Sequence, residues 1–88
     1  MRVTKKQIAL ITVIGATNDD GGFPDIDQIL EKLPYVTTKQ SLQFSLRALI
    51  KNGFAEKRGL ELRRGQSRVV LSLTKEGYRM MQTHSVSV

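Results

Sequence analysis

The chain has 88 residues, which is enough for one domain with a modest core and leaves little room for a second. Apolar residues make up 40% and charged residues 25% of the chain, values that exclude fibrous and low-complexity classes. There is no cysteine, which excludes disulfides and thiolate chemistry. The formal net charge of +6 favours an anionic partner, and by itself it fits a nucleic acid, a membrane surface or an acidic protein.

The positive charge is concentrated after residue 31. Residues 1–31 contain three basic and five acidic side chains, a net charge of −2, whereas residues 32–88 contain eleven basic and three acidic side chains, a net charge of +8. A surface that binds a polyanion is therefore expected in the second part of the chain.

The first predicted element is a core helix from Thr4 to about Ala16. Thr4 and Gln7 have the spacing of a capping box, and Val3 and Ile8 occupy the positions of a hydrophobic staple. The basic start and the apolar run also imitate a short signal peptide, but a loop-forming segment follows, and the run is too short to span a bilayer. No membrane association is expected.

A short second helix is predicted over residues 25–32. It opens on the capping-box pair Asp25 and Gln28, and Pro34 prevents its continuation. This helix is followed after a brief turn by a third, so the two are predicted to form a helix-turn-helix unit.

The third helix is predicted over residues 37–52, with Thr37 and Gln40 as its capping box and Gly53 as its left-handed stop. Four apolar residues share the face that is predicted to pack on the core: Leu42, Leu46, Leu49 and Ile50. The opposite face carries Gln40, Gln43, Phe44, Arg47 and Lys51. No acidic residue lies between Gln40 and Lys51, as expected for a surface that faces phosphates.

The polar face of this helix has the chemistry of base recognition, because Gln can bond bidentately to adenine, Arg to guanine, and Ser or Thr to either base. The residues expected to reach deepest are Thr38, Lys39, Gln40, Ser41 and Gln43. Arg47 and Lys51 lie further along and are predicted to contact phosphates. For Phe44, contact with a thymine methyl, a dimer interface and burial under the hairpin are all considered, and burial or an interface is favoured.

A β-hairpin is predicted after Gly53, with strand character at residues 54–58, 60–62 and 69–73. The segment between the strands is predicted to be a tip that contacts DNA through Arg63, Arg64, Gln66 and Arg68. Arginine forms forked bonds with phosphates and fits narrow minor grooves. The alternative is a solubilising loop that blunts a sheet edge. One short fourth helix is expected after the hairpin, giving a single domain over residues 1–83 and a flexible tail over 84–88.

Catalytic chemistry finds no support in the sequence. The single histidine, His84, falls in the polar tail, and catalysis needs convergent groups. The carboxylates around the glycine turn lack the spacing of a calcium site, and no glycine-rich phosphate loop with its lysine is present. We expect no catalytic residue, no metal and no cofactor.

The motifs together resemble the DNA-binding core of MarR-type winged-helix regulators, which are related to PadR-like and ArsR-like proteins. The resemblance covers nearly the whole chain and is carried by residues 3–7, 42–57 and 68–77. It implies an α+β winged helix-turn-helix fold, with a three-helix core, a wing of two or three strands and a short C-terminal helix. It also implies sequence-specific binding to double-stranded DNA in transcriptional, replication or partition control. Carried onto this sequence, the family's contacts fall on Gln40, Ser41, Gln43, Phe44 and the wing arginine Arg68.

Two departures from the family pattern are visible. Gln66 stands where the family has an acidic residue two positions before the wing arginine, which removes the usual brace from the expectation. Family members also dimerise through long helices outside the winged core, and only residues 1–3 precede the first cap here. A homodimer would therefore use the first helix, the last helix or Phe44, or DNA would align two monomers.

The expected location is the cytoplasm, with association to the nucleoid when DNA is bound. The alternative function is a winged-helix protein-interaction module without direct DNA readout. RNA binding is a minor third reading. Modules that bind proteins usually lose the basic wing, which this sequence keeps, so DNA binding is favoured.

Overall fold

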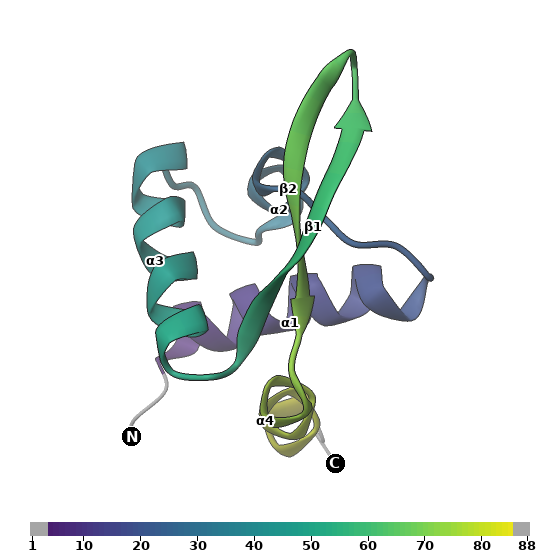
Figure 1. The fold of residues 1–88 in the computed structure, drawn as a ribbon. Coiled ribbons are helices and arrows are strands. Elements are labelled where there is room, and N and C mark those ends of the chain that lie inside the picture. Colours follow the sequence, from purple (N-terminus) through teal and green to yellow (C-terminus); the bar gives the residue numbers. More distant parts are fainter. Residues whose placement is uncertain (1–3, 86–88) are drawn as a thin grey trace.

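The computed structural model describes residues 4–85, which form four helices and one two-stranded antiparallel sheet. The elements follow in the order α1 (Lys5–Asp19), α2 (Ile26–Lys32), α3 (Lys39–Lys51), β1 (Ala55–Arg63), β2 (Gln66–Leu73) and α4 (Lys75–Ser85). In Figure 1, α1 runs beneath α3 and the hairpin, and the hairpin extends past α2 into solvent. This is the predicted α+β winged helix-turn-helix arrangement.

The starts of α1 and α2 follow the predicted capping boxes. The Thr4 hydroxyl accepts a hydrogen bond from the Gln7 amide at 3.1 Å, and the Gln7 side chain accepts one from the Thr4 amide at 2.9 Å. Asp25 and Gln28 repeat this exchange at 2.9 and 3.0 Å. These caps satisfy amides that have no partner within the helix, and they define where each helix begins. The predicted staple residue Val3 lies outside the described residues.

The predicted start of α3 is wrong by one residue. Thr38 is the N-cap, and its hydroxyl accepts a hydrogen bond from the Ser41 amide at 3.1 Å. Either of two adjacent threonines has the chemistry of a cap. The chain stays extended through Thr38, at φ −92° and ψ 158°, so the second threonine caps the helix.

The end of α3 is a Schellman motif, as the predicted stop at Gly53 requires. Gly53 has φ +83°, its amide donates to the Ile50 carbonyl at 3.1 Å, and the Phe54 amide donates to the Leu49 carbonyl at 2.9 Å. The Phe54 carbonyl then accepts a hydrogen bond from the Thr74 amide at 3.1 Å. The end of α3, the start of β1 and the start of α4 are therefore tied together at one place.

The core lies between α1, α2, α3 and the base of the hairpin. Its buried apolar side chains are Leu10, Ile11, Ile14, Ile29, Leu42, Leu46, Leu49, Phe54, Ala55, Leu71 and Leu73. The predicted inner face of α3 is confirmed, with Ile50 partly buried against the same cluster. Burial of this face fixes which side of α3 is presented to solvent.

The hairpin is more completely paired than predicted. Its register runs from Ala55 opposite Leu73 to Arg63 opposite Gln66, so the predicted loop over residues 63–68 is reduced to a two-residue turn. The turn residues, Arg64 and Gly65, both have positive φ, at 52° and 77°. Positive φ at both positions matches the twist of the strands, so pairing continues up to the turn. Two or three strands were predicted, and the sheet has two. The free edge of β2 is used by the Leu71 amide, which donates a hydrogen bond to the Pro24 carbonyl at 2.9 Å.

A β-bulge interrupts β1. Lys57 pairs with Leu71 and Gly59 with Val70, which leaves Arg58 as an extra residue, and Gly59 takes φ +132°. A bulge bends the strand and increases its local twist. The extra residue packs on the body, because the Arg58 guanidinium lies 5.2 Å from the centre of the Phe23 ring.

The fourth helix extends through residue 85, so the predicted domain end at residue 83 falls inside it. Residues 86–88 of the predicted tail lie outside the described residues. Within residues 4–85, none of the helices combines the length and the apolar character needed to cross a membrane.

Candidate nucleic-acid interface

One face of α3 is exposed and carries no carboxylate. Its residues are those predicted from the helical period: Gln40, Gln43, Phe44, Arg47 and Lys51, all exposed. The helix Lys39–Lys51 contains three basic and no acidic side chains. This face therefore has the composition of a surface that can approach phosphates without charge repulsion.

Phe44 is 76% exposed, so the predicted burial under the hairpin is wrong. Within residues 4–85 the hairpin extends past α2 (Figure 1), and the Phe44 ring lies open to solvent. The interface and the base contact considered for Phe44 remain predictions.

The amino-terminal residues of α3 are partly engaged within the protein. The Thr38 hydroxyl caps the helix, and the Lys39 ammonium forms an ion pair with Asp27 of α2 at 3.0 Å. Gln40 and Ser41 are exposed. Among the five residues expected to reach deepest into the groove, Gln40, Ser41 and Gln43 have exposed side chains that are not used as a cap or in an ion pair.

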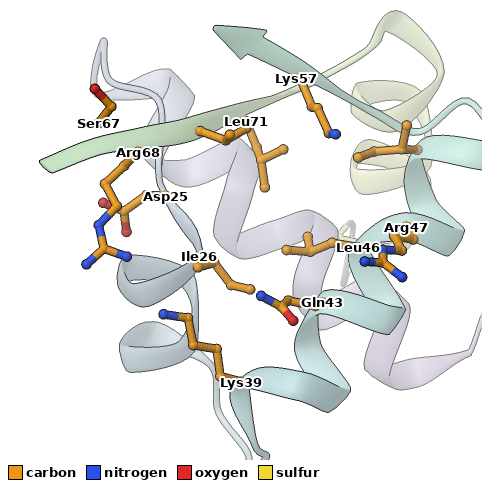
Figure 2. A pocket seen from close by; sticks show the side chains of 12 residues that line it. Asp25, Ile26, Lys39, Gln43, Leu46, Arg47, Lys57, Ser67, Arg68 and Leu71 are labelled. Carbon is orange, nitrogen blue, oxygen red and sulfur yellow. The ribbon is translucent and has the colours of Figure 1, made fainter. Parts of the chain in front are cut away.

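A cleft of about 380 Å³ separates α3 from the hairpin. Figure 2 shows Lys39, Gln43 and Arg47 approaching it from α3, while Lys57 and Arg68 approach it from the strands. Its apolar lining comes from residues of α2, α3 and β2: Ile26, Leu46, Ile50, Val69 and Leu71. The folded chain thus brings basic residues of three elements, α3, β1 and β2, to the edges of one cleft.

Lys57 was not among the predicted site residues. It lies just before the bulge in β1, opposite Leu71, which places it at the cleft. Strand alternation could have indicated its face, but only with the position of the bulge known.

The arginines of the wing have different roles. Arg63 is only 24% exposed at its side chain and is turned toward the body. It donates hydrogen bonds to the Phe23 carbonyl at 2.8 Å, to Gln28, to Glu61 at 2.6 Å and to Asp25 at 3.4 Å. The hydrogen bond to Glu61, followed by the charges of Glu61 and Asp25, raises the pKa of Arg63 despite the opposing effect of burial. Arg63 therefore ties β1 to the start of α2.

Arg64 is the arginine at the turn. It is exposed and has φ 52°, an uncommon value for a residue other than glycine. Gln66 is exposed beside it, at the first position of β2. These two residues form the outermost polar part of the wing.

Arg68 is braced by an acidic residue of α2 that is not among the predicted site residues. Its guanidinium lies 3.0 Å from Oδ2 of Asp27, while Oδ1 of the same carboxylate lies 3.0 Å from Lys39. The hydrogen bond from Lys39, followed by the charges of Lys39, Arg68 and Arg64, lowers the pKa of Asp27 against the opposing effect of desolvation. The resemblance implies an acidic residue at position 66 that would brace Arg68. In this chain Asp27 of α2 provides that carboxylate.

The acidic residues before and within α2 could have been recognised from their charge. Asp25 and Asp27 are two carboxylates at the start of a helix in a chain whose hairpin is rich in arginine. Across the described residues, no group of three or more His, Cys, Asp or Glu side chains could hold a metal ion. In this chain these carboxylates bind arginine and lysine.

No family model and no curated protein matches this sequence. Solved structures do match its fold. FabT of Streptococcus pneumoniae in complex with DNA superimposes with a TM-score of 0.74 and 27% identity, over 93% of this chain and 52% of that one. The repressor MarR of Listeria monocytogenes gives a TM-score of 0.72 and 22% identity, over 91% and 48%.

A third match is PadR of Bacillus subtilis in complex with operator DNA, with a TM-score of 0.72 and 12% identity, over 93% of this chain and 47% of that one. The present chain spans about half the length of these three proteins. Its fold is a winged helix that resembles those of the MarR- and PadR-type proteins.

Proposed function

We propose that this chain is a sequence-specific double-stranded DNA-binding protein that acts as a small regulator of transcription, or of replication or partition. The observation that carries the proposal is the exposed, carboxylate-free face of α3 beside a basic hairpin. The structural likeness to FabT and PadR, both solved in complex with DNA, supports it. Such a protein works in the cytoplasm and associates with the nucleoid when it binds DNA.

In this proposal α3 enters the major groove. Gln40, Ser41 and Gln43 read base edges, since amide and hydroxyl side chains bond to the groove's donor and acceptor patterns. Arg47 and Lys51 hold phosphates along the same helix.

The wing carries the second contact. Arg64 and Gln66 at its turn reach the backbone or the minor groove, where a guanidinium fits a narrow, negatively charged groove. The cleft between the wing and α3 is lined in part by Lys39, Lys57 and Arg68. In this proposal they bind the phosphates between the two grooves. These roles divide base reading from backbone binding, as in other groove-binding helices.

A salt titration tests the proposal. If about five cations neutralise phosphates, the plot of log affinity against log salt should fall with a slope of about −4 to −5. Arg47→Gln should make the slope shallower by about 0.9, because one phosphate contact is lost. Arg79→Gln is the control: Arg79 is an exposed arginine on α4, which is not part of the proposed interface, and its substitution should leave the slope unchanged. A slope near zero for the unaltered protein would overturn the proposal.

A protein-interaction module is the second candidate, and the exposed apolar side chains favour it. Val36, Phe44 and Leu62 are 101%, 76% and 76% exposed. Single exposed apolar residues such as Val36 and Phe44 are common on protein surfaces. Leu62 is not isolated, because Leu60 and Val69 are a cross-strand pair next to it and are 68% and 43% exposed. This function predicts no duplex binding even at about 50 mM salt, where phosphate contacts are strong.

A further inference from the structure

We propose that Asp27 is a positioning residue that fixes the wing relative to α3 and thereby sets the preference for specific over random DNA. The inference rests on the proposed DNA-binding function. Its carrying observation is one carboxylate shared by two cations, one at the start of α3 and one in β2.

The geometry joins three elements. Oδ1 of Asp27 lies 3.0 Å from the Lys39 ammonium, and Oδ2 lies 3.0 Å from the Arg68 guanidinium. Asp27 itself lies in the first turn of α2. Each carboxylate oxygen therefore has its own cation, and α2 stands between the two elements proposed to contact DNA.

The ion pairs of Asp27 are expected to add little to the free energy of unfolding. The side chains of Asp27 and Lys39 are both 45% exposed, and that of Arg68 is 30% exposed. Ion pairs with this much solvent around them contribute little to the free energy of unfolding. Their effect is expected in the position of the wing.

The wing needs such a contact on its second strand. On β1, Arg63 already bonds to Asp25, Gln28 and the Phe23 carbonyl, close to the turn. On β2, Arg68 is the corresponding tie, and its partner is Asp27. Loss of that tie leaves the outer part of the hairpin held through one strand only.

The link also affects how Lys39 and Arg68 meet phosphates. Lysine has three donors and arginine five, so each can bond to the carboxylate and still donate to a phosphate. Asp27 holds both cations in fixed positions, so a duplex must meet the wing and α3 at one spacing. Without Asp27, both cations can move to meet the phosphates of any duplex. The affinity for random DNA then rises relative to the affinity for the specific site.

The test compares Asp27→Asn with Glu31→Gln on a selected duplex and a random duplex. Glu31 is an exposed carboxylate one turn further along α2, so its substitution removes the same charge from the same helix. Asp27→Asn should lower the ratio of specific to random affinity about 10-fold without weakening random binding, in the range of one lost base contact. Glu31→Gln should change both affinities alike and keep the ratio.

A double substitution checks that Asp27 acts through Arg68. Asp27→Asn in an Arg68→Gln background should change the specificity ratio by less than about 2-fold, because residues that act through one contact are not additive. A full 10-fold effect in that background would overturn the role of the Arg68 contact. Arg68→Gln alone tests the same link if Asp27→Asn does not fold.

Amide hydrogen exchange gives a measurement that needs no DNA. Asp27→Asn should speed amide exchange in residues 63–68. Its free energy of unfolding should equal that of the Glu31→Gln variant. Unchanged wing exchange together with an unchanged ratio would overturn the inference. If the unaltered protein itself does not distinguish the duplexes and shows a flat salt dependence, the proposed function fails instead.

Discussion

At the scale of single residues, Gly77 decides how closely α4 approaches the body. A Cβ at this position would lie 2.0 Å from the Phe54 carbonyl oxygen and 3.1 Å from a Leu73 methyl group. The carbonyl is held in place, because it accepts the hydrogen bond of the Thr74 amide at 3.1 Å. Any side chain at residue 77 must therefore move α4 or break that bond.

Gly77→Ala should destabilise the protein, although alanine is the better helix former by about 1 kcal/mol. The clash with a fixed carbonyl dominates, and we expect a loss of about 1–3 kcal/mol in urea unfolding. Gly22→Ala is the control, since its Cβ would meet nothing nearer than 3.8 Å. That variant should stay within about 1 kcal/mol of the unaltered protein. Equal unfolding midpoints for the two variants would contradict the assignment.

Residue roles could be predicted where they depend on local sequence. The caps at Thr4 and Asp25 need a partner three residues away, and both were confirmed. The roles of Arg63 and Arg64 could not be separated in this way. Arg63 bonds to Asp25 and Gln28, 38 and 35 residues earlier, and only the folded chain brings them together.

At the scale of elements, α3 and the wing present different chemistry. The helix carries amide and hydroxyl groups beside its cations, whereas the turn of the wing carries Arg64, with Gln66 next to the turn at the start of β2. Groups that read bases and groups that hold phosphates respond differently to mutation.

Gln43→Ala should relax the preference at one base position by about 1–3 kcal/mol, because a base-edge contact is lost. Arg64→Ala should weaken all duplexes alike and make the salt slope shallower by about 0.9. The measurement is affinity for a selected duplex, its single-base variants and a random duplex. If Gln43→Ala lowers affinity for specific and random duplex equally, α3 is not the reading helix.

The elements themselves were predictable to different degrees. The faces of α3 follow from a helical period that tertiary packing preserved. The length of the wing did not follow from strand propensity, because Arg64 and Gly65 both take positive φ and let the strands pair up to the turn. The bracing by Asp27 was missed, because it depends on how α2 lies against the hairpin.

At the scale of the whole molecule, one chain presents one helix, α3, that we propose reads DNA. Three or four side chains reaching base edges specify only a short site, which a genome contains many times. A second copy bound to an adjacent half-site would provide the remaining specificity. The faces available for such an arrangement include the one that carries the exposed ring of Phe44.

Selection of bound sequences from a random duplex pool should return a two-fold symmetric motif, with half-sites about one helical turn apart. Sedimentation on the selected duplex should then give two chains per duplex, and a duplex with one half-site should bind one chain more weakly. A short, asymmetric motif bound by a single chain would show that one copy reads DNA alone.

The bulge in β1 has a consequence for how such a wing can change in evolution. Arg58 lies outside the ladder, while Lys57 and Gly59 pair with the consecutive residues Leu71 and Val70. Deletion of Arg58 would leave every cross-strand partner and every side-chain face as it is, and would remove the bend together with the contact between Arg58 and the Phe23 ring. A change of one residue in chain length can therefore redirect the tip of the wing without changing which residues pair across the hairpin.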